Sequence, residues 1–316
     1  MIGVTRPHKE RVTSIQYSRD GKLLCTTSAD KFVWFLENHK ADTEFGDVEY
    51  TPLGFYLAEN PVRSVDWRTD HVVVIAAGSS AIEVELPQDT STLASLTTAT
   101  FDISKDLKCT KFAYKRKPTL ASAVAVEPLL DPMGNPIEDD GEDEEEEVVA
   151  EVLSAIYKRT GLIDETLILS LSEPDEGMLY ECKHGNDYAL NELVSHVGEC
   201  RTLRYSSSGK FVLSGSKDGT AYIRAAANPD HFVCVHLHDG NLGEVTSLCT
   251  SFDDEFLLTG DSSGCLFVSR IRPMEIEAHA AEAATNNSAM VKNAKLKVMS
   301  VAKVNFFLWW TQKTIA

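Results

Sequence analysis

One cysteine and two histidines alternate along a short segment in the C-terminal half of the chain, Cys234-Val235-His236-Leu237-His238. Side chains of a β-strand point alternately to its two faces, so these three groups would share one face. Thiolate and imidazole are common zinc ligands, and three of them could begin a zinc site. The spacing indicates no fourth ligand. We therefore predict no metal and keep Cys234, His236 and His238 as the alternative candidates.

Two other segments contain only part of a catalytic motif. Gly260 to Gly264 (GDSSG) has the letters of a serine-nucleophile loop. Nucleophilic catalysis also needs an oriented base and oxyanion donors, and the sequence shows no pattern for them. Ser206 to Lys210 (SSSGK) lacks the earlier glycine and the following Ser or Thr of a phosphate-binding loop. We predict turns at both places, and an interaction protein without catalytic residues or cofactors.

The elements that position these residues are repeated strand–turn–strand units. Their first strands are predicted to begin at Val12, Val62, Leu153, Cys200 and Val245, which are 50, 91, 47 and 45 residues apart. Three of these intervals lie near the roughly 40–45 residues of one WD40 propeller blade. Apolar and polar residues alternate within the units, as in half-buried strands. We expect five antiparallel blades that bury their faces by stacking on one another.

The repeats resemble the WD40 family, whose blades are braced by hydrogen bonds among a His, a Ser or Thr, an Asp and a Trp. The resemblance implies bracing roles for residues in the first, fourth and fifth units. These are His8, Ser28 and Asp30; His196, Ser216 and Asp218; and His238 and Thr259, with Ser263 at the Asp position. The Trp positions hold Leu36, Arg224 and Ser269, so the brace is incomplete.

The predicted fold class is therefore all-β, a WD40-type β-propeller with about five recognisable blades. WD40 rings usually close with about seven blades, so we expect an incomplete or fragmentary propeller. Residues 8–127 are assigned to blades 1 and 2 and the start of blade 3, and residues 148–273 to the remaining blades. Residues 128–147 are expected to form a disordered acidic insertion, and 274–316 a helical or irregular tail. Within this tail Met274 to Ala284 favours a helix, and Asn286-Asn287-Ser288 is expected to end it.

The formal net charge of the chain is −18, and half of it lies in one segment. Glu138 to Glu147 contains nine acidic residues, interrupted by Gly141. Such a run is typical of a solvated, disordered loop, and a basic partner is the alternative interpretation. Nucleic-acid binding needs clustered Lys and Arg, and the best cluster, Lys111 with Lys115-Arg116-Lys117, is short and lies beside the acidic run. We predict no nucleic-acid partner.

The seven cysteines form no CxxC pair. Together with the N-terminal sequence, which does not resemble a signal peptide, they favour a reducing, cytoplasmic environment. The chain has no apolar run near the roughly 18–20 residues of a membrane span, so we predict no membrane partner.

Several further segments are similar to blades of the cilia- and flagella-associated WD-repeat proteins. They are His238 to Ser247 with Ser251 to Asp254, Gly177 to Cys182, Ser195 to Cys200, Tyr50 to Phe55, and Ile82 to Pro87. This resemblance covers about His8 to Pro273. It implies a non-enzymatic scaffold of the ciliary or flagellar axoneme that helps to tether inner-arm dynein to doublet microtubules and so regulates ciliary movement. The implied partners are dynein arm and tether components and the doublet. A general cytosolic WD40 adaptor, such as a substrate receptor or trafficking scaffold, is the alternative.

Overall fold

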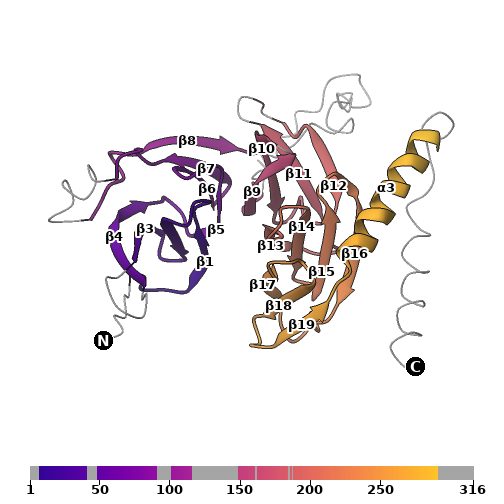
Figure 1. Ribbon diagram of the computed structural model, residues 1–316. Coiled ribbons are helices and arrows are strands. Elements are labelled where there is room, and N and C mark those ends of the chain that lie inside the picture. The colour runs from indigo at the N-terminus through magenta and orange to yellow at the C-terminus, as the bar shows by residue number, and fades with distance from the viewer. Residues whose placement is uncertain are drawn as a thin grey trace, which may run out of the picture. The chain divides into compact units, whose positions relative to one another are not determined.

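The repeated segments form five antiparallel sheets in chain order, which we call blades 1 to 5 (Figure 1). The computed structural model describes residues 7–40, 48–90, 101–115, 149–160, 162–183, 186 and 188–290. Blade 1 consists of β1 Val12–Tyr17, β2 Leu23–Ser28, β3 Phe32–Lys40 and β4 Val48–Leu57. Blade 2 consists of β5 Val62–Trp67, β6 Val72–Ala77, β7 Ser80–Glu85 and β8 Lys108–Ala113. Blade 3 consists of β9 Val152–Thr160, β10 Leu162–Leu171, β11 Met178–Lys183 and β12 Asn191–Val194. Blade 4 consists of β13 Cys200–Tyr205, β14 Phe211–Ser216, β15 Thr220–Ala225 and β16 Asn228–His236. Blade 5 consists of β17 Val245–Thr250, β18 Phe256–Asp261 and β19 Leu266–Arg270. The predicted all-β propeller with five blades is confirmed.

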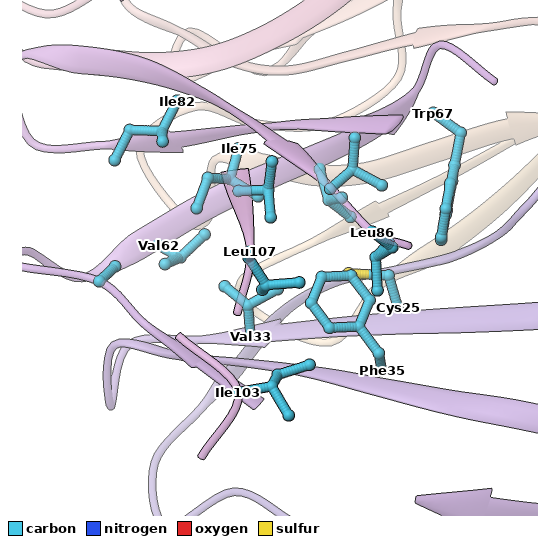
Figure 2. Close-up of a cluster of buried hydrophobic side chains, with 14 of the residues drawn as sticks. Cys25, Val33, Phe35, Val62, Trp67, Ile75, Ile82, Leu86, Ile103 and Leu107 are labelled. Atoms are coloured by element: carbon cyan, nitrogen blue, oxygen red, sulfur yellow. The ribbon is translucent and has the colours of Figure 1, made fainter. Parts of the chain in front are cut away.

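Consecutive blades pack face to face through apolar side chains. Cys25, Val33 and Phe35 of blade 1 lie in one buried cluster with Val62 and Trp67 of blade 2, as Figure 2 shows. All five side chains are at most 1% exposed. Because strand side chains alternate, each sheet offers one apolar face to the blade before it and another to the blade after it. Stacking of successive repeats therefore provides the core.

The innermost strand of every blade carries a register irregularity at the same place. In β1, β5, β13 and β17 the register shifts between the first and third residues, and β9 shows the equivalent shift opposite Ser170 and Leu171. A bulge of this kind places one extra residue against its partner strand and redirects that side chain. Four of the five redirected residues are polar: Thr13, Arg63, Arg201 and Thr246.

The turn at Asp218-Gly219 depends on glycine. Gly219 has a φ of +81°, in the left-handed region that a side chain disfavours. A Cβ at this position would also lie 2.4 Å from the carbonyl oxygen of His238. The turn between β14 and β15 therefore passes directly against the segment that enters blade 5.

Residues from Arg272 onward form a compact unit of their own, which contains the helix α3, Pro273–Met290. The expectation that Asn286-Asn287-Ser288 ends the helix is wrong, because α3 continues to Met290. Asn and Ser disfavour a helix by only about 0.5 kcal/mol each relative to Ala, which does not stop an established helix. Within the described residues, no helix is long and apolar enough to cross a membrane. The expected acidic insertion 128–147 and residues 291–316 of the tail lie outside the described residues.

Candidate interaction site at the propeller axis

The inner strands of all five blades meet around a hollow at the propeller axis. Its lining residues come from β1, β5, β9, β13 and β17: Thr13, Ser14, Gln16, Arg63, Ser64, Val65, Asp66, Ser154, Ile156, Arg201, Thr202, Leu203, Arg204 and Thr246. The four polar residues redirected by the strand bulges belong to this set. Hydroxyl, amide and guanidinium groups thus converge where the bulges point them, which suits recognition of a polar or acidic ligand.

Asp66, on β5, connects three blades through hydrogen bonds and is only 2% exposed. Its carboxylate accepts from the Gln16 side-chain amide at 3.1 Å and from the Arg159 Nη2 at 2.9 Å. It also accepts from the backbone N–H of Tyr157 at 2.9 Å. The Arg159 guanidinium in turn lies 4.6 Å from the centre of the Tyr205 ring, in blade 4. This buried network fixes the relative positions of the inner strands.

The arginines of the axis are held in place by ion pairs and one long-range hydrogen bond. Arg201 contacts Glu199 at 2.8 Å and Glu244 at 3.0 Å, which joins blade 4 to the entry of blade 5. Arg204 Nη2 donates to the carbonyl oxygen of Ile15 at 3.1 Å, so the inner strands of blades 4 and 1 meet across the axis. The side chains that form the axial surface are therefore positioned before any ligand binds.

In blade 5 the structure places the two predicted bracing residues together. His238 Nε2 lies 2.8 Å from Thr259 Oγ1, and both residues are at most 3% exposed. The other ring nitrogen, Nδ1, lies 2.8 Å from Asp261 Oδ2. Ser263, which the sequence placed at the Asp position, donates instead to Asp261 Oδ1 at 2.6 Å. Asp261 therefore supplies the carboxylate, two residues earlier than predicted.

In blades 1 and 4 the hydroxyl partner differs from the predicted one. His8 Nε2 lies 2.8 Å from Thr26 Oγ1, and its Nδ1 lies 3.3 Å from Asp30 Oδ1. Ser28, the expected partner, accepts from the backbone N–H of Asp30 at 3.2 Å. The prediction of Ser28 is thus corrected to Thr26, because side chains two residues apart share a strand face and the spacing cannot separate them.

Blade 4 shows the same shift and one additional link. His196 Nε2 lies 2.9 Å from Ser214 Oγ, so Ser214 replaces the predicted Ser216. His196 Nδ1 lies 2.6 Å from Thr220 Oγ1, which itself donates to Asp218 at 2.5 Å. Burial lowers the pKa of His196 to about 4, although the nearby Asp218 opposes this effect. The imidazole is therefore neutral at physiological pH.

Arg224 replaces the expected tryptophan of blade 4 and is 1% exposed. Its Nη1 donates to the carbonyl oxygen of Pro229 at 2.9 Å, and its Nη2 donates to that of Val194. The guanidinium lies 4.7 Å from the centre of the Phe232 ring. A planar cation that stacks on an aromatic ring fills the flat space that a tryptophan would occupy.

The alternative zinc candidates are not brought together. Cys234 and His236 are exposed near the end of β16, whereas His238 is buried with Thr259 and Asp261. No group of three or more His, Cys, Asp or Glu side chains that could hold a metal occurs among the described residues. The GDSSG and SSSGK segments lie on the β18–β19 and β13–β14 turns, where the sequence places them.

Comparison with known proteins identifies the repeats. The family model of the WD domain, G-beta repeat, matches residues 1–35, 188–224 and 232–268. The chain is 25% identical to mouse (Mus musculus) cilia- and flagella-associated protein 44 over 325 residues, which cover 84% of this chain and 17% of that protein. The crystal structure of the Cps50 (Swd1) β-propeller domain from Myceliophteria thermophila superimposes with a TM-score of 0.53 and 16% identity, over 84% of this chain and 72% of that one. The chain thus contains WD40 repeats on a β-propeller, a fold that typically serves as a non-catalytic scaffold.

Proposed function

We propose that this chain is a non-enzymatic scaffold of the ciliary or flagellar axoneme. The observation that carries the proposal is the similarity to mouse cilia- and flagella-associated protein 44, which extends over 84% of the chain rather than over one repeat. The chain spans 17% of that relative's length, so the proposal concerns the propeller region. More specifically, we propose that the propeller helps to tether inner-arm dynein to doublet microtubules and so acts in ciliary movement.

The axial surface is the proposed contact point with an axonemal partner. Its side chains are fixed in advance by the Asp66 network and by the ion pairs of Arg201. Such preorganisation favours binding, because little side-chain entropy is lost when a partner docks. Arg204, whose guanidinium donates to the neutral Ile15 carbonyl oxygen, suits a partner segment that carries carboxylates. The guanidinium groups of Arg63 and Arg201 already pair with glutamates of this chain.

Localisation and retention in ciliated cells test the proposal. The tagged chain is expected in the axoneme and should remain there after detergent extraction, whereas a diffuse cytosolic signal would reject the ciliary role in favour of a general WD40 adaptor. Thr246→Glu places a carboxylate at the exposed rim of the axial hollow, where it would repel an acidic partner segment. We expect it to lower retention at least fivefold. Thr110→Glu makes the same change at an exposed site on β8 and should have no effect. Equal retention of both variants would remove the axial surface from the proposal.

A further inference from the structure

Blade 1 exposes residues whose equivalents are buried in the other four blades. The first, fourth and sixth residues of each inner strand form the rear face of the blade. In blades 2 to 5 they are at most 8% exposed: Val62, Val65, Trp67; Val152, Ala155, Tyr157; Cys200, Leu203, Tyr205; Val245, Leu248 and Thr250. In blade 1 they are Val12, Ile15 and Tyr17, which are 44%, 52% and 45% exposed. The difference arises because a preceding blade covers the other four rear faces.

Blade 5 shows the complementary difference on its forward face, formed by alternate residues of its second and third strands. In blade 1 this face is Leu23, Cys25, Val33 and Phe35, which are at most 3% exposed and pack on blade 2. Val33 pairs with Thr27, the fifth residue of β2, and Leu266 pairs with Gly260, the fifth residue of β18. Leu266 of blade 5 is therefore equivalent to Val33 of blade 1. By this register the forward face of blade 5 is Phe256, Leu258, Leu266 and Val268. Phe256, Leu266 and Val268 are 40%, 67% and 61% exposed.

The outer edge of blade 5 differs from that of the other blades as well. Blades 1 to 4 each contain four strands, whereas blade 5 contains three within the described part of the chain. The edge strand β19, Leu266–Arg270, therefore offers backbone groups to a further strand. The same strand supplies Leu266 and Val268 to the forward face.

We propose that the two ends of the five-blade arc bind a polypeptide that itself folds as WD40-type blades. Its last blade would cover Val12, Ile15 and Tyr17, and its first strand would pack under Phe256, Leu266 and Val268. The molecule supplies the precedent, because the first three internal interfaces each bury the rear-face residues of one blade in an apolar cluster with the blade before it. At the fourth interface, Val245 and Leu248 of blade 5 are buried against Gly215 of blade 4. The partner is thus defined by a repeated apolar interface rather than by one isolated patch.

The number of blades argues against a second copy of the chain as this partner. Propellers typically close with about four to eight blades, so a partner adds about one to three to the five present. A second copy would bring ten blades to one ring. The partner is therefore a segment of roughly 40–135 residues, at about 40–45 residues per blade. This inference concerns the ends of the arc and holds whether or not the protein acts in the axoneme.

Site-specific photo-crosslinking tests the inference on the full chain. A benzophenone amino acid replaces residue 15, residue 268 or, as a control, residue 190, where Leu190 is 53% exposed in blade 3. After irradiation in ciliated cells, adducts from the cytosolic and axonemal fractions are identified by mass spectrometry. We expect adducts of residues 15 and 268 with WD40-repeat peptides outside residues 1–316. The inference would be overturned if the adducts contained this chain or polypeptides that lack such repeats. It would also be overturned if the adduct yields at residues 15 and 268 were no higher than the yield at residue 190.

Charge substitution supplies an independent measurement. Ile15→Asp and Val268→Asp should each lower co-purification of the crosslinked partner at least tenfold, whereas Leu190→Asp should leave it unchanged. Because all three side chains are more than half exposed, each variant should melt within a few degrees of the wild type. Unchanged co-purification by Ile15→Asp or Val268→Asp would exclude that face from the interface.

Discussion

Replacement of Asp66 by alanine tests whether its network holds the inner strands together. The change removes a 2% exposed carboxylate that accepts hydrogen bonds from Gln16, Tyr157 and Arg159. It leaves the buried Tyr157 N–H and the Arg159 guanidinium without this acceptor. Loss of one partner from a buried ion pair costs about 3–5 kcal/mol, and a buried N–H left without an acceptor costs about 1–3 kcal/mol. The two costs arise from the same lost carboxylate, so we expect a total destabilisation of about 3–5 kcal/mol. For a domain of this size the melting temperature should fall by about 10 °C.

Thermal unfolding followed by circular dichroism measures this change, with Asp70→Asn as the control. Asp70 accepts a hydrogen bond from the Asp20 N–H at 2.9 Å in an exposed position, so its loss should cost less than about 1 kcal/mol. The double variant Asp66→Leu with Arg159→Met removes both charges and should recover much of the stability, because the apolar pair leaves no buried charge. A melting temperature of Asp66→Ala equal to that of the Asp70 control would refute the reasoning.

Three further predictions concern blade 4. The pKa of His196 is about 4 in the folded state and about 6.5 when unfolded, so unfolding takes up a proton between these values. The neutral His196 should therefore contribute up to about 3 kcal/mol to the free energy of unfolding above pH 6.5, and this contribution should disappear as the pH falls to 4. The free energies of unfolding of wild type and His196→Gln, measured by urea titration, should converge over this pH range. Arg224→Ala should lower stability by about 3 kcal/mol, and Arg224→Trp should recover part of it in the same assay, since an aromatic ring can fill the space. Gly219→Ala should cost about 2–4 kcal/mol and Gly209→Ala about 1 kcal/mol, because both have positive φ but only Gly219 faces a carbonyl within 3 Å. If chemical denaturation showed that Gly219→Ala and Gly209→Ala lose equal amounts of stability, the steric argument would be contradicted.

The strands and their stacking could be predicted because alternation and turn residues are local signals. The predicted first strands begin at the observed residues in four blades and one residue late in blade 3, where β9 starts at Val152. The bracing hydroxyls Thr26 and Ser214 were missed because residues two apart on a strand share a face. Local patterning therefore identifies the face but not which residue on it binds the histidine.

The Asp66 network could not be predicted, because its members have no fixed spacing in the sequence. Gln16 and Arg159 lie 50 and 93 residues from Asp66 and meet it only after three blades have packed. Arg224 was similarly placed at the tryptophan position without any sign that its guanidinium would stack on Phe232. Side-chain functions that depend on tertiary contacts require the assembled propeller.

The open arc has a consequence for the order in which the chain folds. Each blade packs on the next blade along the sequence, so most interblade contacts join neighbouring repeats. The Arg204 to Ile15 hydrogen bond, which spans 189 residues, is an exception. A closed ring must bring its last repeat back to its first and bear the loop-closure entropy of the whole domain. In this arc the N-terminal blades can pack during synthesis without waiting for the C-terminal ones, as in a linear repeat array.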